Sequence, residues 1–201
     1  MNAIIAEKKF ISERTGIPYS NLSQSYLRAE TALSNLSQYD FELQANNVAN
    51  PIVTERLLDL NDEFVMTHLT IGLKITGAAP TDADQLEAQV YTFPDVTAGF
   101  AASEEAIYNS SFELTINRRV FLPEFPMRFF RRVPDTQEAT IAGAKNGYPN
   151  GLYGFAPFEP IKIDGRQTID ATVSLGASVT STANTSMVLE CRGYLVTNAK
   201  S

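Results

Sequence analysis

The residue types that most often carry chemistry are scarce in this sequence. It contains one histidine, His68, and one cysteine, Cys191, among 201 residues. His68 stands in a run that alternates like a strand, and no close group of acidic residues beside it completes a metal site. A catalytic pair would have to join His68 to Cys191 or to a distant serine. We therefore expect His68 to be structural or at the surface, and Cys191 to be a small buried residue in a strand.

Motifs for phosphate and calcium sites are missing as well. The stretch GYPNGLYGF (147–155) is rich in glycine but has no Walker lysine and no strand-then-helix setting. The stretch DADQLE (82–87) lacks the later glycine and glutamate of a calcium loop, which favours a solvated acidic loop. A paired-carboxylate hydrolase stays formally open because Asp and Glu are plentiful, yet nothing singles out a pair. We expect no enzymatic activity, no cofactor and no metal.

Four arginines form a local concentration of positive charge. LTINRRVFLPEFPMRFFRRVP (114–134) carries the pairs Arg118/Arg119 and Arg131/Arg132. Its prolines each remove a ladder donor, so we expect two strands, or a strand and an extended edge, with the arginine pairs at the outer ends. The whole chain has a net charge of -7 and a pI near 4.8, whereas nucleic-acid-binding proteins are more often basic. Contacts between subunits are therefore favoured for these arginines over a nucleic-acid surface.

Alternation with a period of two dominates the chain and predicts strands. In FVMTHLTIGLKIT (64–76), strict alternation places Val65, Leu69 and Ile71 on one face and Met66 and His68 on the other. The same kind of pattern covers 112–118, 161–163, 168–175 and 185–197, and a weaker one covers 86–93. The dipeptide Asp-Gly at 164–165 predicts a turn between two of these strands.

The remaining segments are less regular. SYLRAETALS and YDFEL predict a hairpin around Asn35; an amphipathic helix is the alternative, and abundant Ser, Thr and Asn favour strands. Residues 3–14 predict a helix, and ASEEAIYN (102–109) predicts one or two helical turns capped by Ser103. Residues 77–86 are expected to be an acidic loop, and 134–160 a long loop with a binding or assembly role.

These patterns together predict an all-β protein. Eight to ten mostly antiparallel strands in a chain of this length fit a two-sheet β-sandwich of the jelly-roll type. We expect a single domain over residues 21–201, preceded by an N-terminal arm at 1–20 with the pattern of a helix. No stretch approaches the roughly 18 apolar residues of a membrane span, and the N-terminus lacks the pattern of a secretory signal.

Several stretches together resemble a group of jelly-roll virion proteins of bacteriophages from environmental and gut bacteria. They are YLRAETAL, YDFEL, TERLLDLNDEF, AIYNSSFELTINRRVFLP, FEPIKIDGRQTIDATVSLG and MVLECRGYLV, and the resemblance spans most of residues 26–196. TERLLDLNDEF and AIYNSSFELTINRRVFLP are the most distinctive of them. The motifs are structural rather than catalytic.

The resemblance implies a capsid or capsid-associated protein (shell, vertex or decoration) that works by self-association. Its partners would be copies of itself, in a homo-oligomer, and other virion proteins; its place would be the virion, after synthesis in the cytoplasm of the bacterial host. Nucleic-acid contact is not expected to dominate. The alternative is a carbohydrate- or receptor-binding β-sandwich module, with Tyr148, Tyr153 and Phe155 as a stacking platform.

Overall fold

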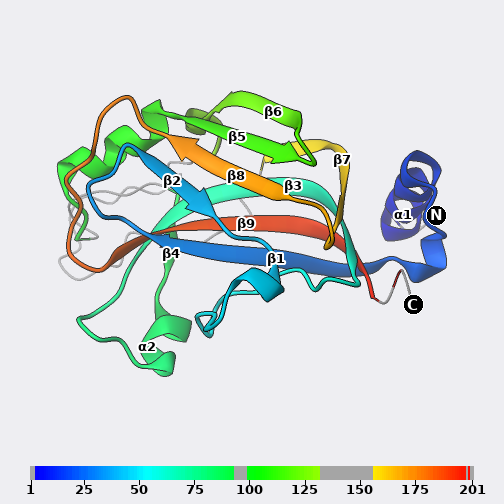
Figure 1. Cartoon of the computed structure of the whole chain (residues 1–201), viewed down its shortest axis with the longest axis horizontal. Coiled ribbons are helices and arrows are strands. Elements are labelled where there is room, and N and C mark those ends of the chain that lie inside the picture. The colour runs from blue at the N-terminus through cyan, green and yellow to red at the C-terminus, as the bar shows by residue number, and fades with distance from the viewer. Residues whose placement is uncertain (1–2, 93–98, 132–155, 198, 200–201) are drawn as a thin grey trace.

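Two antiparallel sheets lie face to face (Figure 1), in a computed structural model that describes residues 3–92, 99–131, 156–197 and 199. The five-stranded sheet contains β1 (Ser23–Ala32), β9 (Thr185–Val196), β3 (Glu63–Ile75), β7 (Ala156–Asp164) and β4 (Val90–Tyr91). The four-stranded sheet contains β2 (Gln38–Phe41), β8 (Ile169–Ser174), β5 (Ser111–Ile116) and β6 (Arg119–Pro126). The expected all-β, two-sheet sandwich is confirmed.

The order of strand pairing is that of a jelly roll. Leaving out the short β4, the first strand pairs with the last, β1 with β9, and the second with the last but one, β2 with β8. The third pair is β3 with β7, and the innermost pair is the hairpin β5–β6. Four nested antiparallel pairs are what a single long hairpin forms when it wraps around a common core.

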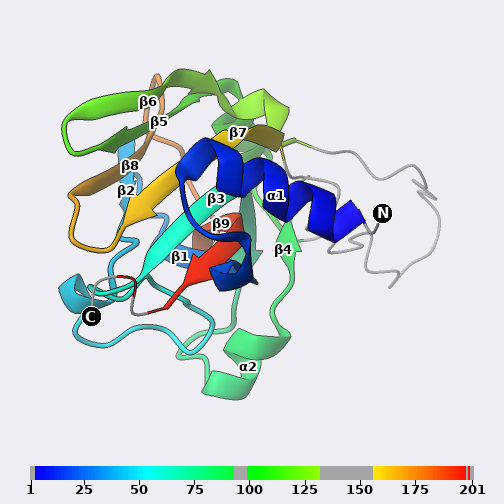
Figure 2. The same ribbon diagram turned by 90° about the vertical axis from the view of Figure 1, so that its right-hand side faces the viewer.

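Helices lie outside the two sheets (Figures 1 and 2). The helix expected near the N-terminus is α1 (Ala3–Thr15), and short 3₁₀ helices span Tyr19–Asn21, Ala45–Asn47, Ala102–Asn109 and Met127–Phe129. The expected acidic loop is instead interrupted by α2 (Asp82–Glu87). Thr81 and Asp84 form a reciprocal capping box there, which satisfies backbone donors that a loop would leave to water. Of the strand expected over 86–93, the described part contains only β4.

The helical turns at Ala102–Asn109 are confirmed, but Ser103 does not cap them. The carboxylate of Glu104 instead accepts the backbone N–H of Ala101 at 2.6 Å, and Ser103 donates to the carbonyl of Thr180. Glu104 is fully buried and also accepts the backbone N–H of Thr182 at 2.7 Å. One carboxylate therefore ties this helix to the segment that precedes β9.

The strands expected on either side of Asn35 are present, but the hairpin between them is wrong. β1 pairs with β9 in one sheet and β2 pairs with β8 in the other, so the chain crosses between sheets at this point. Asn35 has a φ of 55°, and the hydroxyl of Tyr39 accepts the backbone N–H of Leu36 at 3.0 Å. The turn at Asp164–Gly165 likewise connects strands of different sheets. Alternation shows which face of a strand is buried, but it does not name the partner strand.

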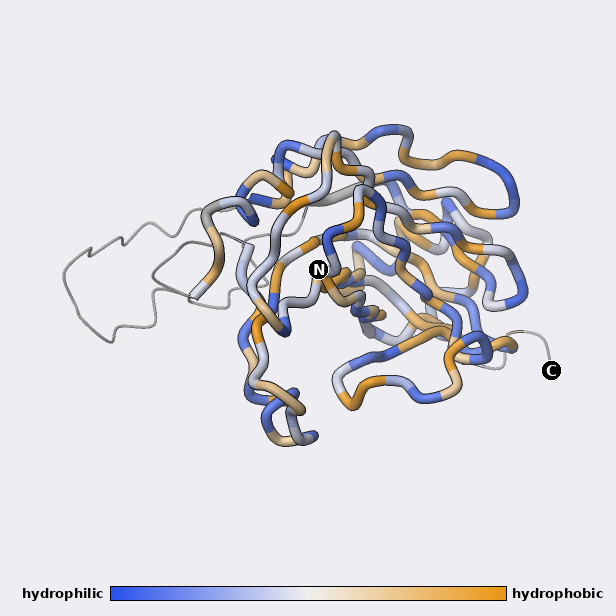
Figure 3. The backbone as a smooth tube through the Cα atoms, turned by 60° about the vertical axis from the view of Figure 1, so that its left-hand side comes forward, coloured by the Kyte–Doolittle hydropathy of each residue, from blue (hydrophilic) through white to orange (hydrophobic). Residues whose placement is uncertain are grey.

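The main core lies between the sheets and contains the inward side chains of both. Figure 3 shows hydrophobic and hydrophilic residues alternating along the strands. Phe64, Ile71 and Phe112 are completely buried, and Cys191 is 1% exposed, as expected for a residue of a buried strand face. Burying one large apolar side chain contributes roughly 1.5–3 kcal/mol, so this shared interior is the main source of stability.

A β-bulge in β3 changes the predicted faces of that strand. The register with β9 shifts between Met66 and His68, so Phe64 and Met66 join Leu69 in the core, and Val65 turns to the outer face. Strict alternation predicted that Val65 and Leu69 share one face. The prediction of the buried face holds from Leu69 onward, but it is wrong for Val65, which precedes the bulge. Opposite the bulge stands Gly193, where a Cβ would lie 1.8 Å from the carbonyl oxygen of Val65. The close approach of β9 to β3 therefore requires glycine.

We predict that Gly193→Ala destabilises the protein by at least about 2 kcal/mol, because β9 and β3 must separate at the bulge. Gly176→Ala is the matched control, since a Cβ at Gly176 meets nothing within 4 Å. Urea unfolding followed by circular dichroism measures both. Equal midpoints for the two variants would show that the contact at Gly193 is not required.

Candidate functional site

The outer face of the five-stranded sheet is the side of β1, β9 and β3 that points away from the other sheet. Its side chains form cross-strand rows, because β9 pairs with β1 on one side and β3 on the other. One row is Tyr26–Arg192–His68, and the next is Arg28–Glu190–Thr70. This face is covered at its two ends and open in the middle.

The first end is covered by α1 and the segment that follows it. Ile11 and Ile17 pack with Val65, Tyr194 and Val196 in a small apolar cluster separate from the main core. Ile11 is fully buried, although most of α1 is exposed. The expected N-terminal arm therefore packs against its own sheet (Figure 2).

The opposite end carries a buried network of charged side chains. Lys74 of β3 pairs with Glu30 of β1, and their side chains are 1% and 0% exposed. Arg28 contacts the same carboxylate at 2.8 Å, and Thr54 donates to it at 2.6 Å. Lys74 also donates to Gln85 of α2 at 2.8 Å. The network therefore fastens both the segment around Thr54 and α2 over this end of the sheet.

The surroundings of Glu30 determine its ionisation. Burial alone would raise the pKa of this carboxyl group, because the charged form loses water. Hydrogen bonds from Lys74 and Thr54, with the positive charges of Lys74 and Arg28, outweigh burial and hold the pKa of Glu30 below its ordinary value of 4.5. Glu30 is therefore a carboxylate at neutral pH.

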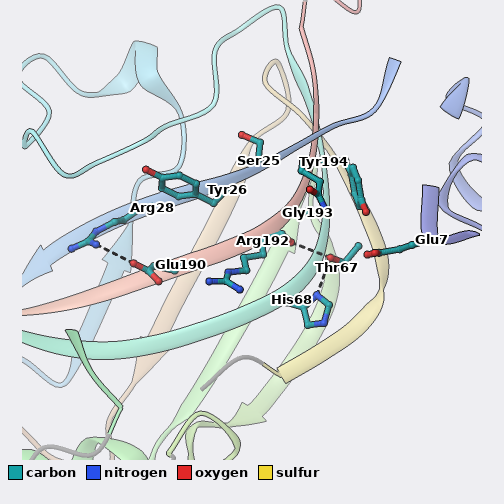
Figure 4. A pocket seen from close by; sticks show the side chains of 11 residues that line it. Glu7, Ser25, Tyr26, Arg28, Thr67, His68, Glu190, Arg192, Gly193 and Tyr194 are labelled. Carbon is teal, nitrogen blue, oxygen red and sulfur yellow. Dashed lines mark hydrogen bonds and ion pairs between the residues drawn. The ribbon is translucent and has the colours of Figure 1, made fainter. Parts of the chain in front are cut away.

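Between the covered ends lies an open groove with a volume of about 960 Å³. Figure 4 shows Tyr26, Arg192 and His68 on its floor and Glu7 of α1 at one end. At the other end, Arg28 and Glu190 form an ion pair of 3.0 Å. We call this feature the outer groove.

His68 lies in the outer groove, half-buried, as part of its polar floor. Its Nδ1 is 3.0 Å from the hydroxyl oxygen of Thr67. Cys191 faces the main core instead, so the single histidine and single cysteine lie on opposite faces of the sheet. Burial raises the pKa of the Cys191 thiol far above its usual range. Among the described residues, no three His, Cys, Asp or Glu side chains are grouped to hold a metal ion.

The structure separates the arginines that the sequence singled out. Arg118 and Arg119 lie at the tip of the β5–β6 hairpin, where Asn117 and Arg118 have φ values of 53° and 64°. Arg131 follows the 3₁₀ helix at the opposite end of β6 and pairs with Glu105 of the same chain. At about 3.3 Å per residue, the 8 residues of β6 place the two ends roughly 25 Å apart. The arginines whose placement is described therefore do not form one patch.

The proline-rich stretch between them is an edge strand, as expected. β6 is last in the order of its sheet, and its pairing with β5 is interrupted by register shifts. Pro123 and Pro126 lack the amide hydrogen that an interior strand would donate. Glu124, between them, has a φ of 43°. An irregular edge of this kind resists pairing with another sheet edge.

Some of the expected site residues lie outside the described residues, namely Arg132, Tyr148, Tyr153 and Phe155. Sequence reasoning missed the outer groove, whose floor includes Tyr26, Arg28, Glu190 and Arg192. The available signal was the polar row of the last strand, where Glu190 and Arg192 alternate with buried residues. This pattern indicates that one face of the strand contacts water or a ligand. It does not indicate which strands lie on either side.

We predict that Lys74→Met destabilises the protein by about 3 kcal/mol, because it removes one of the two cations that, among the described residues, pair with the buried carboxylate of Glu30. The double variant Lys74→Met/Glu30→Gln loses less than the sum of the single variants, because the buried carboxylate that lacks its lysine is gone. Glu105→Gln is the matched control: Glu105 pairs with Arg131 but its side chain is 52% exposed, so we expect less than about 1 kcal/mol. Urea unfolding at pH 7 measures the unfolding free energy of the unaltered chain, the two single variants, the double variant and the control.

The same network predicts a pH dependence. The folded-state pKa of Glu30 is lowered, so its stabilising contribution is present above its ordinary pKa of 4.5 and is lost as the pH falls through the folded-state value. Glu30→Gln should therefore flatten the fall in unfolding free energy below about pH 4.5. An unchanged slope in this variant would contradict the assigned role of Glu30.

Comparison with known proteins gives no relative for this chain. No protein-family model matches it, and neither a curated protein nor a solved structure does so. Among the described residues, no helix has the length and apolar character needed to cross a membrane. The jelly-roll pairing, the arginine hairpin tip, α1 and the outer groove are therefore the observations that bear on function.

Proposed function

We propose that this chain is a structural subunit of a bacteriophage virion, a capsid or capsid-associated protein that acts by self-association. The observation that carries the proposal is the nested pairing of β1–β9, β2–β8, β3–β7 and β5–β6. Viral capsid domains use this jelly-roll architecture, but so do lectins and cupins. The resemblance of residues 26–196 to phage virion proteins favours the first of these classes.

The tip of the β5–β6 hairpin is the first candidate surface for association. Asn117 and Arg118 both have positive φ, as in the two-residue turns that favour Asn-Gly. A left-handed backbone costs a residue with a Cβ roughly 1–2 kcal/mol. Strain of this kind is concentrated at functional sites, where the side chain has a use that offsets it. Arg118 and Arg119 are both exposed there.

The exposed apolar side chains of α1 are the second candidate surface. Ile4, Ile5 and Phe10 are 42%, 44% and 48% exposed, while Ile11 of the same helix is fully buried under the sheet's outer face. Apolar side chains gathered on one short helix are typical of a surface that another subunit covers. A homo-oligomer would bury them without changing how α1 is docked.

A carbohydrate- or receptor-binding module is the second candidate function. The aromatic platform expected for it at Tyr148, Tyr153 and Phe155 lies outside the described residues. The specific observation that favours it is the outer groove, which is open, about 960 Å³ in volume and lined by both polar and apolar surface.

Analytical ultracentrifugation and electron microscopy of the purified chain at increasing concentration test self-association directly. We expect discrete oligomers or closed particles, because symmetric contacts close on themselves. A monomer at every concentration and salt condition would overturn the proposal.

We predict that Arg118→Gly has effects of opposite sign on the subunit and on its assembly. Glycine relaxes the left-handed backbone, so the unfolding free energy should rise by about 1 kcal/mol. Loss of the guanidinium should raise the concentration needed for association about tenfold, which corresponds to about 1.4 kcal/mol. Thermal melts of the dilute subunit and sedimentation at several concentrations separate the two effects.

Charge reversal supplies the companion test. Arg119→Glu should weaken association and change its dependence on salt, while the subunit's melting temperature stays nearly constant, because Arg119 is exposed. The same change at Arg131 also replaces its ion pair with Glu105 by a repulsion, so it should lower the melting temperature as well. If Arg118→Gly and Arg119→Glu both associate at the same concentration as the unaltered chain, the hairpin tip is not part of the interface.

We predict that Ile5→Gln/Phe10→Gln weakens association while changing the stability of the subunit by less than about 0.5 kcal/mol, because both residues are largely exposed. Ile11→Ala is the contrasting variant: it empties a buried position and should cost about 2–4 kcal/mol. Deletion of residues 1–20 is a less specific test, since it also uncovers Val65 and Tyr194. Unaltered oligomers in the double variant would exclude α1 as a contact.

A further inference from the structure

The charges that line the outer groove balance one another. Among the described residues, its charged side chains are Glu7 and Glu190, which are negative, and Arg28 and Arg192, which are positive. Arg28 is already paired with Glu190 at 3.0 Å and with Glu30 at 2.8 Å. A ligand rich in phosphate or carboxylate would meet two glutamates as well as the arginines, so it gains little net attraction.

The groove combines hydrogen-bonding groups with apolar surface, as a sugar combines hydroxyl groups with apolar C–H faces. Gln24, Thr67, His68 and Glu190 supply donors and acceptors within reach of its floor. The exposed large hydrophobic side chain there is Tyr26, which is 45% exposed. A groove lined in this way fits a ligand with many hydroxyl groups, whereas pockets for apolar ligands are lined mainly by hydrophobic side chains.

Tyr26 provides an aromatic surface of fixed orientation on the floor of the groove. The guanidinium of Arg56 lies over its ring at 5.1 Å from the centroid, which restricts the ring's rotation. Cross-strand pairing places Tyr26 beside Arg192, which is itself beside His68. A planar ring next to a guanidinium can stack on the C–H face of a sugar while the guanidinium donates to its hydroxyls.

Tyr194 closes the α1 end of the groove. It is 2% exposed, and Lys8 of α1 lies over its ring at 5.9 Å from the centroid. Burial, together with nearby Glu7, raises the pKa of Tyr194 to about 12, so the phenol keeps its proton at neutral pH. This end of the groove is therefore a packed wall, and a ligand would lie on the open floor beside Tyr26 and Arg192.

We propose that the outer groove binds an uncharged oligosaccharide. The balanced charges, the mixed lining of hydrogen-bonding and apolar surface, and the aromatic surface of Tyr26 beside Arg192 all fit such a ligand. The volume of about 960 Å³ lies at the upper end of the roughly 300–1,000 Å³ of small-molecule sites, which fits several sugar rings better than one. This inference gives the second candidate function a site and a ligand class, and it holds with or without self-association.

The experiment uses the full chain at a dilution where it does not associate. A glycan array is followed by titration of ¹⁵N-labelled protein with maltohexaose, cellohexaose and chitohexaose, and with oligogalacturonate as the acidic comparison. We expect saturable binding of at least one neutral glycan, with amide shifts concentrated at Tyr26, Arg192 and Tyr194. Tyr26→Ala and Arg192→Ala should each weaken binding at least tenfold.

Arg119→Ala is the matched control, because Arg119 is exposed on β6 of the other sheet and should leave binding unchanged. Spectra with native dispersion establish that each variant is folded. The proposal is overturned if no neutral glycan binds, if both groove variants bind as tightly as the unaltered chain, or if oligogalacturonate binds more tightly. Ultracentrifugation of the same samples shows separately whether self-association fails.

Discussion

The pairing of β9 with strands on both sides is the constraint on which the rest of the structure depends. β9 pairs with β1 from Ser186 to Leu195 and with β3 from Thr185 to Val196, so the last strand of the chain holds the first one in place. A slip of one residue would exchange its two faces, moving Leu189 and Cys191 out of the core and Glu190 into it. The absence of a side chain at Gly193 lets β3 bulge without breaking this register.

The same sheet is stabilised differently on its two faces. The inner face buries apolar side chains against β2, β8, β5 and β6, which supplies most of the free energy of folding. On the outer face, the buried pair Lys74–Glu30 contributes little net stability, because removing two charges from water offsets much of their attraction. Its contacts with Thr54 and Gln85 instead fix where the covering segments lie, and this placement leaves the middle of the face open.

The sequence predicts the strands and their buried faces well, because alternation is a local property. Pairing is not local: β1 and β2 look like a hairpin in sequence, yet each finds its partner more than a hundred residues away. The bulge at Thr67 and the helix α2 were missed because each depends on a close contact or a cap rather than on periodicity. The position of β6 at the edge of its sheet was predictable from its prolines. The outer groove was not, since its floor joins side chains of three strands distant in sequence.

The two proposed activities meet at α1. The helix leaves Ile4, Ile5 and Phe10 partly exposed, buries Ile11 against the sheet, and places Glu7 at the end of the outer groove. A subunit contact that moved α1 would therefore change the wall of the groove and the surroundings of the Tyr194 hydroxyl. Linkage is reciprocal, so a ligand that contacts Glu7 and Tyr194 would in turn favour the docked position of α1. If the subunit contact leaves α1 in its docked position, association and ligand binding are not coupled through this helix.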